Sequence, residues 1–338
     1  MPIAPVISIV LPVHNAAPTL PACLASIARQ SCADYELIVV DDGSTDQSAA
    51  LLAEHARADP RIRLLRPGRV GLADALNIGI GASQAPLIAR MDADDLMHPQ
   101  RLAFQAALLA DQPEWALVAA RVAAFPRHLV RDGYREYLRW QNSVLTPEQV
   151  AAEIYIEAPF AHPSVIFRRE AVTAIGGYRN GNFPEDYELW LRMHNAGMPM
   201  AKHPRVLLAW RERPDRTSRR DPRYAREQFD ALRAAFLARD PRLHQERPLV
   251  YWGAGRPTRL RARRLIEQGF PPTAWIDVDP RKIGQKIAAV PVYPPTWLQQ
   301  TPRPFVLVYL TAHGARDDAR SDLHAWGYRP GADYLAVG

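Results

Sequence analysis

The sequence is poor in cysteine and contains no long hydrophobic run. Its 338 residues include two cysteines, Cys23 and Cys32, too few for a disulfide framework. No apolar run approaches the roughly 20 residues that span a bilayer. The first residues also lack the charged region, apolar stretch and cleavage site of a secretory leader. We therefore expect a cytoplasmic protein.

Lysine is scarce as well, so the net charge of +6 comes from arginine. Many arginines lie between Arg205 and Arg226. Such a stretch suits the phosphates of a ligand, an anionic lipid-linked molecule or the inner face of a membrane, where it would make peripheral contact. The alternative is an ordinary solvated face. Nucleic-acid binding is not expected, because no recognition helix or aromatic RNA-binding motif accompanies the charge.

Composition and periodicity indicate a globular α/β protein. Hydrophobic residues make up 48% of the chain and charged residues 23%, and the length suits two domains. Strand and helix patterns alternate through roughly the first 120 residues, which predicts a parallel sheet with crossover helices. The predicted strands cover 6–11, 36–40, 62–65, 86–91 and 115–124, and the predicted helices cover 19–30, 46–58, 71–82 and 99–110. The pattern loosens between Pro126 and Pro159, except for a helix-like stretch at 147–157.

A short apolar run at residues 88–91 ends in three carboxylates, Asp92, Asp94 and Asp95. Carboxylates this close raise one another's pKa unless a cation lies among them. Hard oxygen ligands at a strand end suit Mg²⁺ or Mn²⁺. The alternative is a solvated acidic turn that caps the helix starting near Pro99.

Two further strand ends are polar. The buried-strand pattern at 35–40 leads into Asp41 and Asp42, and the strand at 6–11 leads into 12–15. In open parallel sheets, ligands bind in the crevice beyond the carboxyl ends of the strands. The three strand ends therefore predict one binding crevice, although residues 42–46 are also typical of an Asx turn.

These motifs, in order and spacing, resemble family-2 glycosyltransferases over roughly residues 6–220. The resemblance implies a GT-A type mixed sheet flanked by helices, with a nucleotide-binding half at about 1–125 and an acceptor half at about 126–220. It is carried by Ser8–Asn15, Val39–Asp46, Gly71–Gly79, Met91–Asp95, Ala161–Arg168, Gly176–Tyr178 and Pro184–Arg192.

For the metal site, the resemblance implies that Asp94 is a ligand of Mn²⁺ or Mg²⁺. Asp92 and Asp95 would assist, one through the ribose hydroxyl and the other through metal-bound water. The cation would stabilise the negative charge that develops on a leaving nucleoside diphosphate. Arg211 and Arg213 are expected to contact the diphosphate, on a loop that orders when the donor binds.

For the nucleotide base, the resemblance implies that Asp42 accepts a hydrogen bond from uracil, with Asp41 as the alternative. That contact favours uridine or thymidine diphosphate over adenine or guanine nucleotides. Pro12, Val13 and His14 are expected to flank the base.

On the opposite side of the crevice, the resemblance implies inversion of the anomeric centre by direct displacement. Asp186 is the expected general base and Glu185 the residue that orients it or the acceptor. Acids in a first helical turn are also common without any catalytic role. His162 and Trp190 are expected on the acceptor or donor-sugar side.

The tail forms a further unit. Residues 221–247 are predicted to be a helical linker, and 248–338 resemble the Rossmann-like unit at the N-terminus of sugar acyltransferases. Gly253 and Gly255 lie where a backbone approaches phosphate, and Asp277 lies where a ribose-binding acid is expected. Three interpretations stay open: a degenerate structural domain, a second nucleotide or sugar-nucleotide site, and an NAD enzyme.

The leading hypothesis is an inverting, metal-dependent glycosyltransferase. It would move a sugar from a nucleotide-sugar, with UDP favoured, to a saccharide or lipid-linked acceptor during synthesis of a bacterial surface glycan. The alternatives are a nucleotidyltransferase of related fold and a non-catalytic sugar-nucleotide-binding protein. The sequence indicates no oligomeric state.

Overall fold

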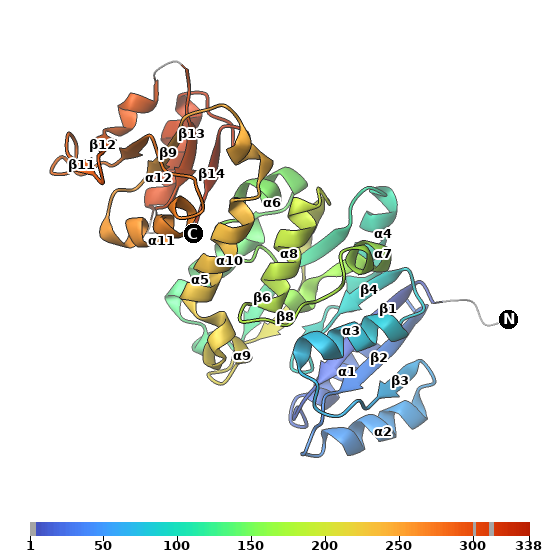
Figure 1. The fold of residues 1–338 in the computed structure, drawn as a ribbon. Coiled ribbons are helices and arrows are strands. Elements are labelled where there is room, and N and C mark those ends of the chain that lie inside the picture. Colours follow the sequence, from blue (N-terminus) through green and yellow to red (C-terminus); the bar gives the residue numbers. More distant parts are fainter. Residues whose placement is uncertain (1–4, 300–301, 311–313) are drawn as a thin grey trace. The chain divides into compact units, whose positions relative to one another are not determined.

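The chain folds into two compact units (Figure 1). The computed structural model describes residues 5–299, 302–310 and 314–338. The first unit comprises Met1–Pro147 and Pro159–Arg223, and the second comprises Glu148–Ala158 and Tyr224–Gly338. The structure therefore groups residues 148–158, which the sequence analysis placed in the acceptor half, with the C-terminal part of the chain. It does the same with most of the predicted linker.

The first unit is built on an eight-stranded mixed sheet in the order β3-β2-β1-β4-β7-β6-β8-β5. The pairs β3–β2, β2–β1, β1–β4 and β6–β8 are parallel, whereas β7 runs antiparallel to β4 and β6, and β5 antiparallel to β8. The strands are β1 (Ile7–Val13), β2 (Tyr35–Asp41), β3 (Ile62–Leu65), β4 (Leu87–Arg90), β5 (Leu96–Met97), β6 (Leu117–Phe125), β7 (Ile166–Arg168) and β8 (Met200–Arg211).

Every residue of β1 and β2 is buried, as expected for parallel strands covered on both faces by helices. The helices of this unit include α1 (Leu20–Ala28), α2 (Ser48–Ala58), α3 (Leu72–Ala82), α4 (Arg101–Asp111), α5 (Asp132–Ser143), α7 (Arg169–Ala174), α8 (Glu185–Asn195) and α9 (Thr217–Arg220). The predicted alternation is confirmed through β6. The structure adds α5, in the segment where the periodicity loosens.

The second unit contains its own six-stranded sheet, in the order β11-β12-β10-β9-β13-β14. All neighbours are parallel except β11 and β12. Its strands are β9 (Leu249–Trp252), β10 (Ala274–Ile276), β11 (Lys286–Ile287), β12 (Val290–Tyr293), β13 (Phe305–Val308) and β14 (Tyr334–Ala336). Its helices include α10 (Arg226–Leu237), α11 (Arg256–Ile266) and α12 (Ala315–Ala325), and α6 (Pro147–Glu153) lies almost wholly in it.

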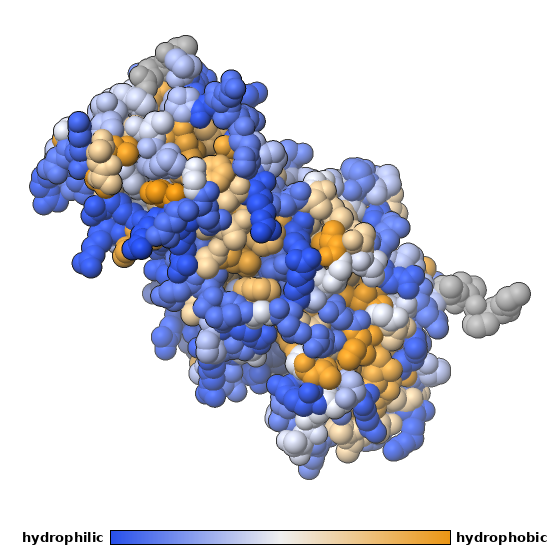
Figure 2. All heavy atoms as spheres, in the orientation of Figure 1, coloured by the Kyte–Doolittle hydropathy of each residue, from blue (hydrophilic) through white to orange (hydrophobic). Residues whose placement is uncertain are grey.

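Over the described ranges, no helix combines the length and the hydropathy needed to cross a bilayer. Figure 2 shows that hydrophilic residues cover most of the visible face, with hydrophobic residues exposed among them.

Helix α3 packs closely on the sheet because it carries Gly79. A Cβ atom at Gly79 would lie 2.5 Å from Cγ1 of Val10 on β1, whereas a Cβ at Gly81 on the same helix would meet nothing within 4 Å. The close approach of α3 to β1 therefore depends on the missing side chain at Gly79.

We predict that Gly79→Ala lowers the free energy of unfolding by about 1–3 kcal/mol, because the added methyl group forces Val10 or the helix to shift. Gly81→Ala is the matched control, and it should be neutral or stabilise by up to about 1 kcal/mol through helix propensity. Urea unfolding of both variants checks this. Equal effects at the two positions would contradict the packing argument.

Candidate active site

The carboxyl end of β4 carries the acidic cluster of Asp92, Asp94 and Asp95. Carboxylate oxygens of all three lie within 4.8 Å of one another. Asp95 is fully buried, and Asp92 and Asp94 are partly buried. Burial and then the charge of Asp92 raise the pKa of Asp94. Burial and then the charges of Asp92 and Asp94 raise the pKa of Asp95 well above its usual range. The cluster is therefore unstable as a set of three anions unless cations compensate it.

Two arginines and one backbone amide supply part of that compensation. Nη1 of Arg90 lies 2.5 Å from Oδ1 of Asp92, and Nη2 of Arg213 lies 3.2 Å from Oδ2 of Asp94. The amide of Arg211 donates to Oδ1 of Asp95 at 2.7 Å. Oδ2 of Asp95 is buried and accepts no hydrogen bond from the described residues. A buried carboxylate oxygen without a donor, beside two other carboxylates, fits a hard divalent cation.

The segment after β8 is fixed by a buried acid. Glu212 is 2% exposed and pairs with Arg216 at 3.3 Å and with Arg219 at 2.6 Å. The guanidinium of Arg216 also lies 4.3 Å from the ring centroid of Trp210. Part of the arginine-rich stretch is thus internal to the fold, where it holds Arg213 beside the acidic cluster.

Arg211 and Arg213 differ in how they are engaged. Nε of Arg211 donates to the carbonyl oxygen of Asp94 at 2.6 Å, and its guanidinium lies over the ring of Phe125 at 4.4 Å. The side chain of Arg213 is 40% exposed. Arg211 therefore anchors the loop, and Arg213 is the more accessible of the two predicted phosphate ligands.

The ends of β1 and β2 meet beside this cluster, as the strand order requires. Pro12 and Val13 are buried in β1, and the exposed His14 makes a hydrogen bond through Nδ1 with the carbonyl oxygen of Asp42 at 2.9 Å. Oδ1 of Asp41 accepts from the amide of Ser44 at 3.0 Å. This contact with the amide three residues on closes the acidic turn and fixes the direction of the Asp41 side chain.

Asp42 anchors the loop that leads into α3. Its Oδ1 accepts from the amides of Val70 at 2.6 Å and Gly71 at 3.0 Å, and its Oδ2 pairs with Arg69. These contacts explain why the motif at 71–79 accompanies the acidic turn. They also occupy both oxygens of Asp42, the carboxylate that was expected to accept a hydrogen bond from the nucleotide base. Asp41, its alternative, has the amide of Ser44 on one oxygen.

The other side of the site is formed by the first turn of α8 and the segment around His162. Glu185 is 2% exposed, and its carboxylate lies 3.9 Å from Nδ1 of His162 and 4.0 Å from Nη1 of Arg223. Asp186 is partly buried, and its Oδ1 accepts from the amide of Tyr187 at 2.7 Å. Asp186 is thus the more accessible of the two predicted catalytic acids.

His162 lies in an aromatic environment. Its Nε2 is 2.8 Å from the hydroxyl of Tyr178, and its ring meets that of Trp190 edge-on with centroids 5.9 Å apart. Burial, followed by the charge of Arg90, lowers the pKa of His162 well below its ordinary value, and burial raises the pKa of Tyr178. Both groups are therefore neutral near pH 7. The buried Nε1 of Trp190 has no hydrogen-bond partner among the described residues.

Three residues of this region were not predicted: Arg90, Tyr178 and Asn77. Asn77 on α3 donates to the carbonyl oxygen of Tyr178 and accepts from its amide, both at 2.8 Å. Gly177 leaves room for this contact, because a Cβ there would lie 2.5 Å from Oδ1 of Asn77. The motifs at 71–79 and 176–178 were recognised, but the contact between them was not. Arg90 carried a signal, since an arginine within an apolar strand needs a buried anion.

Comparisons with known proteins identify the family of the chain. The Glycosyl transferase family 2 profile matches residues 8–176. The amylovoran biosynthesis glycosyltransferase AmsE of Erwinia amylovora is 31% identical over 202 residues, which are 60% of this chain and 73% of the relative.

Two solved structures share the fold. The structure of S. aureus TarS 1–349 in complex with UDP-GlcNAc has a TM-score of 0.51 at 14% identity, over 69% of this chain and 72% of that one. The mannosyltransferase PcManGT from Pyrobaculum calidifontis, in complex with GDP-Man and Mn²⁺, has a TM-score of 0.50 at 21% identity. The match covers 79% of this chain and 70% of that one. The predicted GT-A type mixed sheet is thereby confirmed.

The first unit has a fold of the GT-A type. Sequence similarity then gives the family: the chain belongs to glycosyltransferase family 2.

Proposed function

We propose that this enzyme is an inverting, metal-dependent glycosyltransferase that uses a nucleotide-sugar donor. The observation that carries the proposal is the acidic cluster of Asp92, Asp94 and Asp95. Its carboxylates lie close together, and the buried Oδ2 of Asp95 accepts no hydrogen bond from the described residues. Asp94 is the principal ligand in this proposal, and Asp92 and Asp95 assist it. A bound Mn²⁺ or Mg²⁺ would neutralise the charge that develops on the leaving diphosphate.

The donor site in this proposal lies between that cluster and the ends of β1 and β2. Arg213, on an accessible side chain beside Asp94, would contact the diphosphate. His14 would face the base, and Asp41 would accept its hydrogen bond because both oxygens of Asp42 are already engaged. A carboxylate acceptor matches the ring N–H of uracil. The related structures hold UDP-GlcNAc in one case and GDP-Man in the other, so the base must be tested directly.

The acceptor site in this proposal lies at the first turn of α8. Direct displacement needs a base on the side of the anomeric carbon opposite the leaving group, and Asp186 takes that role. The buried Glu185 would position the acceptor side through its neighbours His162 and Arg223. Trp190 is fully buried, so it would act on this side only by packing against His162.

We further propose that the product is a bacterial surface glycan, made on the cytoplasmic side of the membrane from a saccharide or lipid-linked acceptor. The name of the related amylovoran biosynthesis enzyme supports this class of product. Exposed arginines such as Arg220 could contact anionic lipid, whereas Arg216 and Arg219 are tied to Glu212.

The first prediction from the proposed function concerns the metal. Calorimetric titration with UDP should show binding in Mn²⁺, weaker or no binding in EDTA, and loss of the metal effect in Asp94→Ala, because the principal ligand is gone. TDP and GDP titrated in parallel test the choice of base. Asp34→Ala, which removes an exposed carboxylate elsewhere, should bind as the wild type does. An affinity for UDP that changes neither in EDTA nor in Asp94→Ala would contradict the proposed site.

The second prediction concerns the proposed general base, Asp186. Asp186→Asn should keep the affinity for UDP and Mn²⁺ and reduce transfer from a UDP-sugar by about 10²–10⁴-fold, because the attacking hydroxyl keeps its proton. Glu170→Gln, which changes an exposed acid in the first turn of α7, controls for a general helix-terminus effect. Product analysis by NMR reports inversion or retention. Undiminished transfer by Asp186→Asn would remove this residue from the mechanism.

The third prediction separates two effects of Arg213. Arg213→Ala should bind Mn²⁺ several-fold more tightly without nucleotide, because Asp94 loses its competing cation. The same variant should bind UDP in Mn²⁺ about tenfold more weakly, because a charge-assisted contact to phosphate is lost. Arg220→Ala changes the net charge equally and should leave both affinities unchanged. If both affinities of Arg213→Ala moved in the same direction, the double assignment would be wrong.

A further inference from the structure

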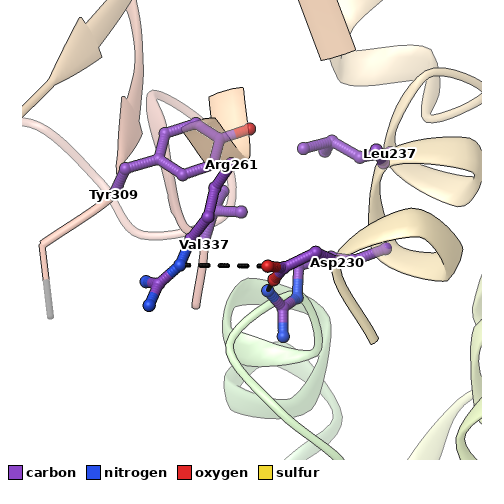
Figure 3. Close-up of a pocket in the computed structure, with 7 residues that line it drawn as sticks. Asp230, Leu237, Arg261, Tyr309 and Val337 are labelled. Carbon is purple, nitrogen blue, oxygen red and sulfur yellow. Dashed lines mark hydrogen bonds and ion pairs between the residues drawn. The ribbon is translucent and has the colours of Figure 1, made fainter. Parts of the chain in front are cut away.

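Helix α11 of the second unit is strongly basic. It has 11 residues, of which five are arginines and none is an acid. Four of these arginines are exposed: Arg256, Arg259, Arg263 and Arg264. The fifth, Arg261, is 7% exposed and its Nε lies 4.0 Å from the carboxylate of Asp230 on α10 (Figure 3). The inner face of α11 is therefore packed within the second unit, and the outer face carries the charge.

The outer face of α11 has little negative charge near it. Glu267, which follows the helix, pairs with Arg263 at 2.6 Å. Among the described residues, no acid pairs with Arg256, Arg259 or Arg264. Arg256 is also the first residue of the helix, where the partial positive charge of the N-terminus disfavours a cation. The charge of this face is not compensated by the protein itself, which favours an anionic partner.

A leucine lies in the middle of the same face. Leu260 is 59% exposed, and Arg256 and Arg264 lie four residues before and after it. Residues four apart are neighbours on a helix surface, so this apolar side chain has guanidinium groups on both sides. A leucine alone on a surface is ordinary. Between uncompensated cations it suits a lipid surface, where the headgroup phosphates meet the charges and the acyl boundary meets the leucine.

The loop after β10 adds a second exposed aliphatic side chain near the start of α11. The amide of Ala254, two residues before the helix, donates to Oδ2 of Asp277 at 2.8 Å, and this contact holds the loop there. Val278 in the loop is 72% exposed. Asp277 and Asp279 lie 3.0 Å and 3.7 Å from Nζ of Lys282. These two acids are therefore matched within the loop and do not offset the arginines of α11.

We propose that the outer face of α11, with the adjoining loop, binds an anionic phospholipid bilayer. The exposed arginines supply the electrostatic attraction, and Leu260 and Val278 enter the headgroup boundary. Nucleic acid suits this face less well, because single strands are held on aromatic side chains and α11 has none. The surface belongs to the second unit and does not depend on the proposed transferase chemistry.

Co-sedimentation of the full chain with lipid vesicles tests this proposal. Vesicles of phosphatidylcholine alone are compared with vesicles of equal parts phosphatidylcholine and phosphatidylglycerol. The chain should sediment with the mixed vesicles at low salt, and less at high salt because the charges are screened. Equal binding to both kinds of vesicle would overturn the proposal. Absence of binding to the mixed vesicles, with or without binding of a labelled RNA duplex, would overturn it too.

Variants locate the surface. Arg256→Gln combined with Arg259→Gln should weaken binding to the mixed vesicles by roughly 25-fold, since each basic residue at an anionic surface contributes roughly fivefold. Leu260→Gln keeps the charge and should weaken binding several-fold. Arg29→Gln combined with Arg57→Gln removes two exposed arginines of the first unit, so it should bind as the wild type does.

Arg220→Gln separates this surface from the arginine-rich stretch at 205–226, and it should also bind as the wild type does. All the substituted side chains are exposed, so the variants should fold normally. The assignment to α11 would be wrong if Arg220→Gln or the first-unit double variant lost as much binding as the α11 double variant. Wild-type binding by Leu260→Gln would show a purely ionic contact and would also overturn the proposal.

Discussion

Repulsion among three carboxylates is the constraint on which the arrangement of the first unit depends. Asp92, Asp94 and Asp95 follow one short strand, and no such cluster is stable in a partly buried place without nearby positive charge. The fold supplies that charge from separate parts of the chain. Arg90 comes from β4 itself, and Arg213 comes from the segment beyond β8, more than a hundred residues later. Ion pairs with the acidic cluster therefore contribute to the arrangement of the site alongside packing.

The same constraint links the proposed donor side to the proposed acceptor side. Arg90 pairs with Asp92, and its charge also acts on the buried imidazole of His162. His162 in turn contacts Tyr178 and lies near Glu185. A continuous set of contacts thus runs from the acidic cluster to the first turn of α8. Substitutions at Arg90 are expected to affect both sides together, which distinguishes it from residues that serve one ligand.

Local patterns were sufficient to predict most of the fold. Strands β1 to β4, the helices between them and a second sheet followed from periodicity, and the acidic cluster from its position at a strand end. Contacts between segments far apart in the sequence were harder to predict. No local signal indicates that Asn77 binds the backbone of Tyr178, or that Asp42 is occupied by the amides of Val70 and Gly71. The helix α5 was missed although Tyr134, Tyr137 and Leu138 recur at helical spacing and pack on the core, because most of its other residues are polar or charged.

The second unit is discontinuous in sequence, and this affects how the enzyme can be divided. Residues 148–158 leave the first unit, and the hydroxyl of Tyr155 donates to Asp240 at 2.9 Å while its carbonyl oxygen accepts from the amide of Gly338. Ile154 and Tyr155 are fully buried. A single cut after residue 223 would expose these apolar side chains to water. Transplanting the transferase unit between proteins would thus require two exchanges along the gene, with a replacement for the excursion at 148–158.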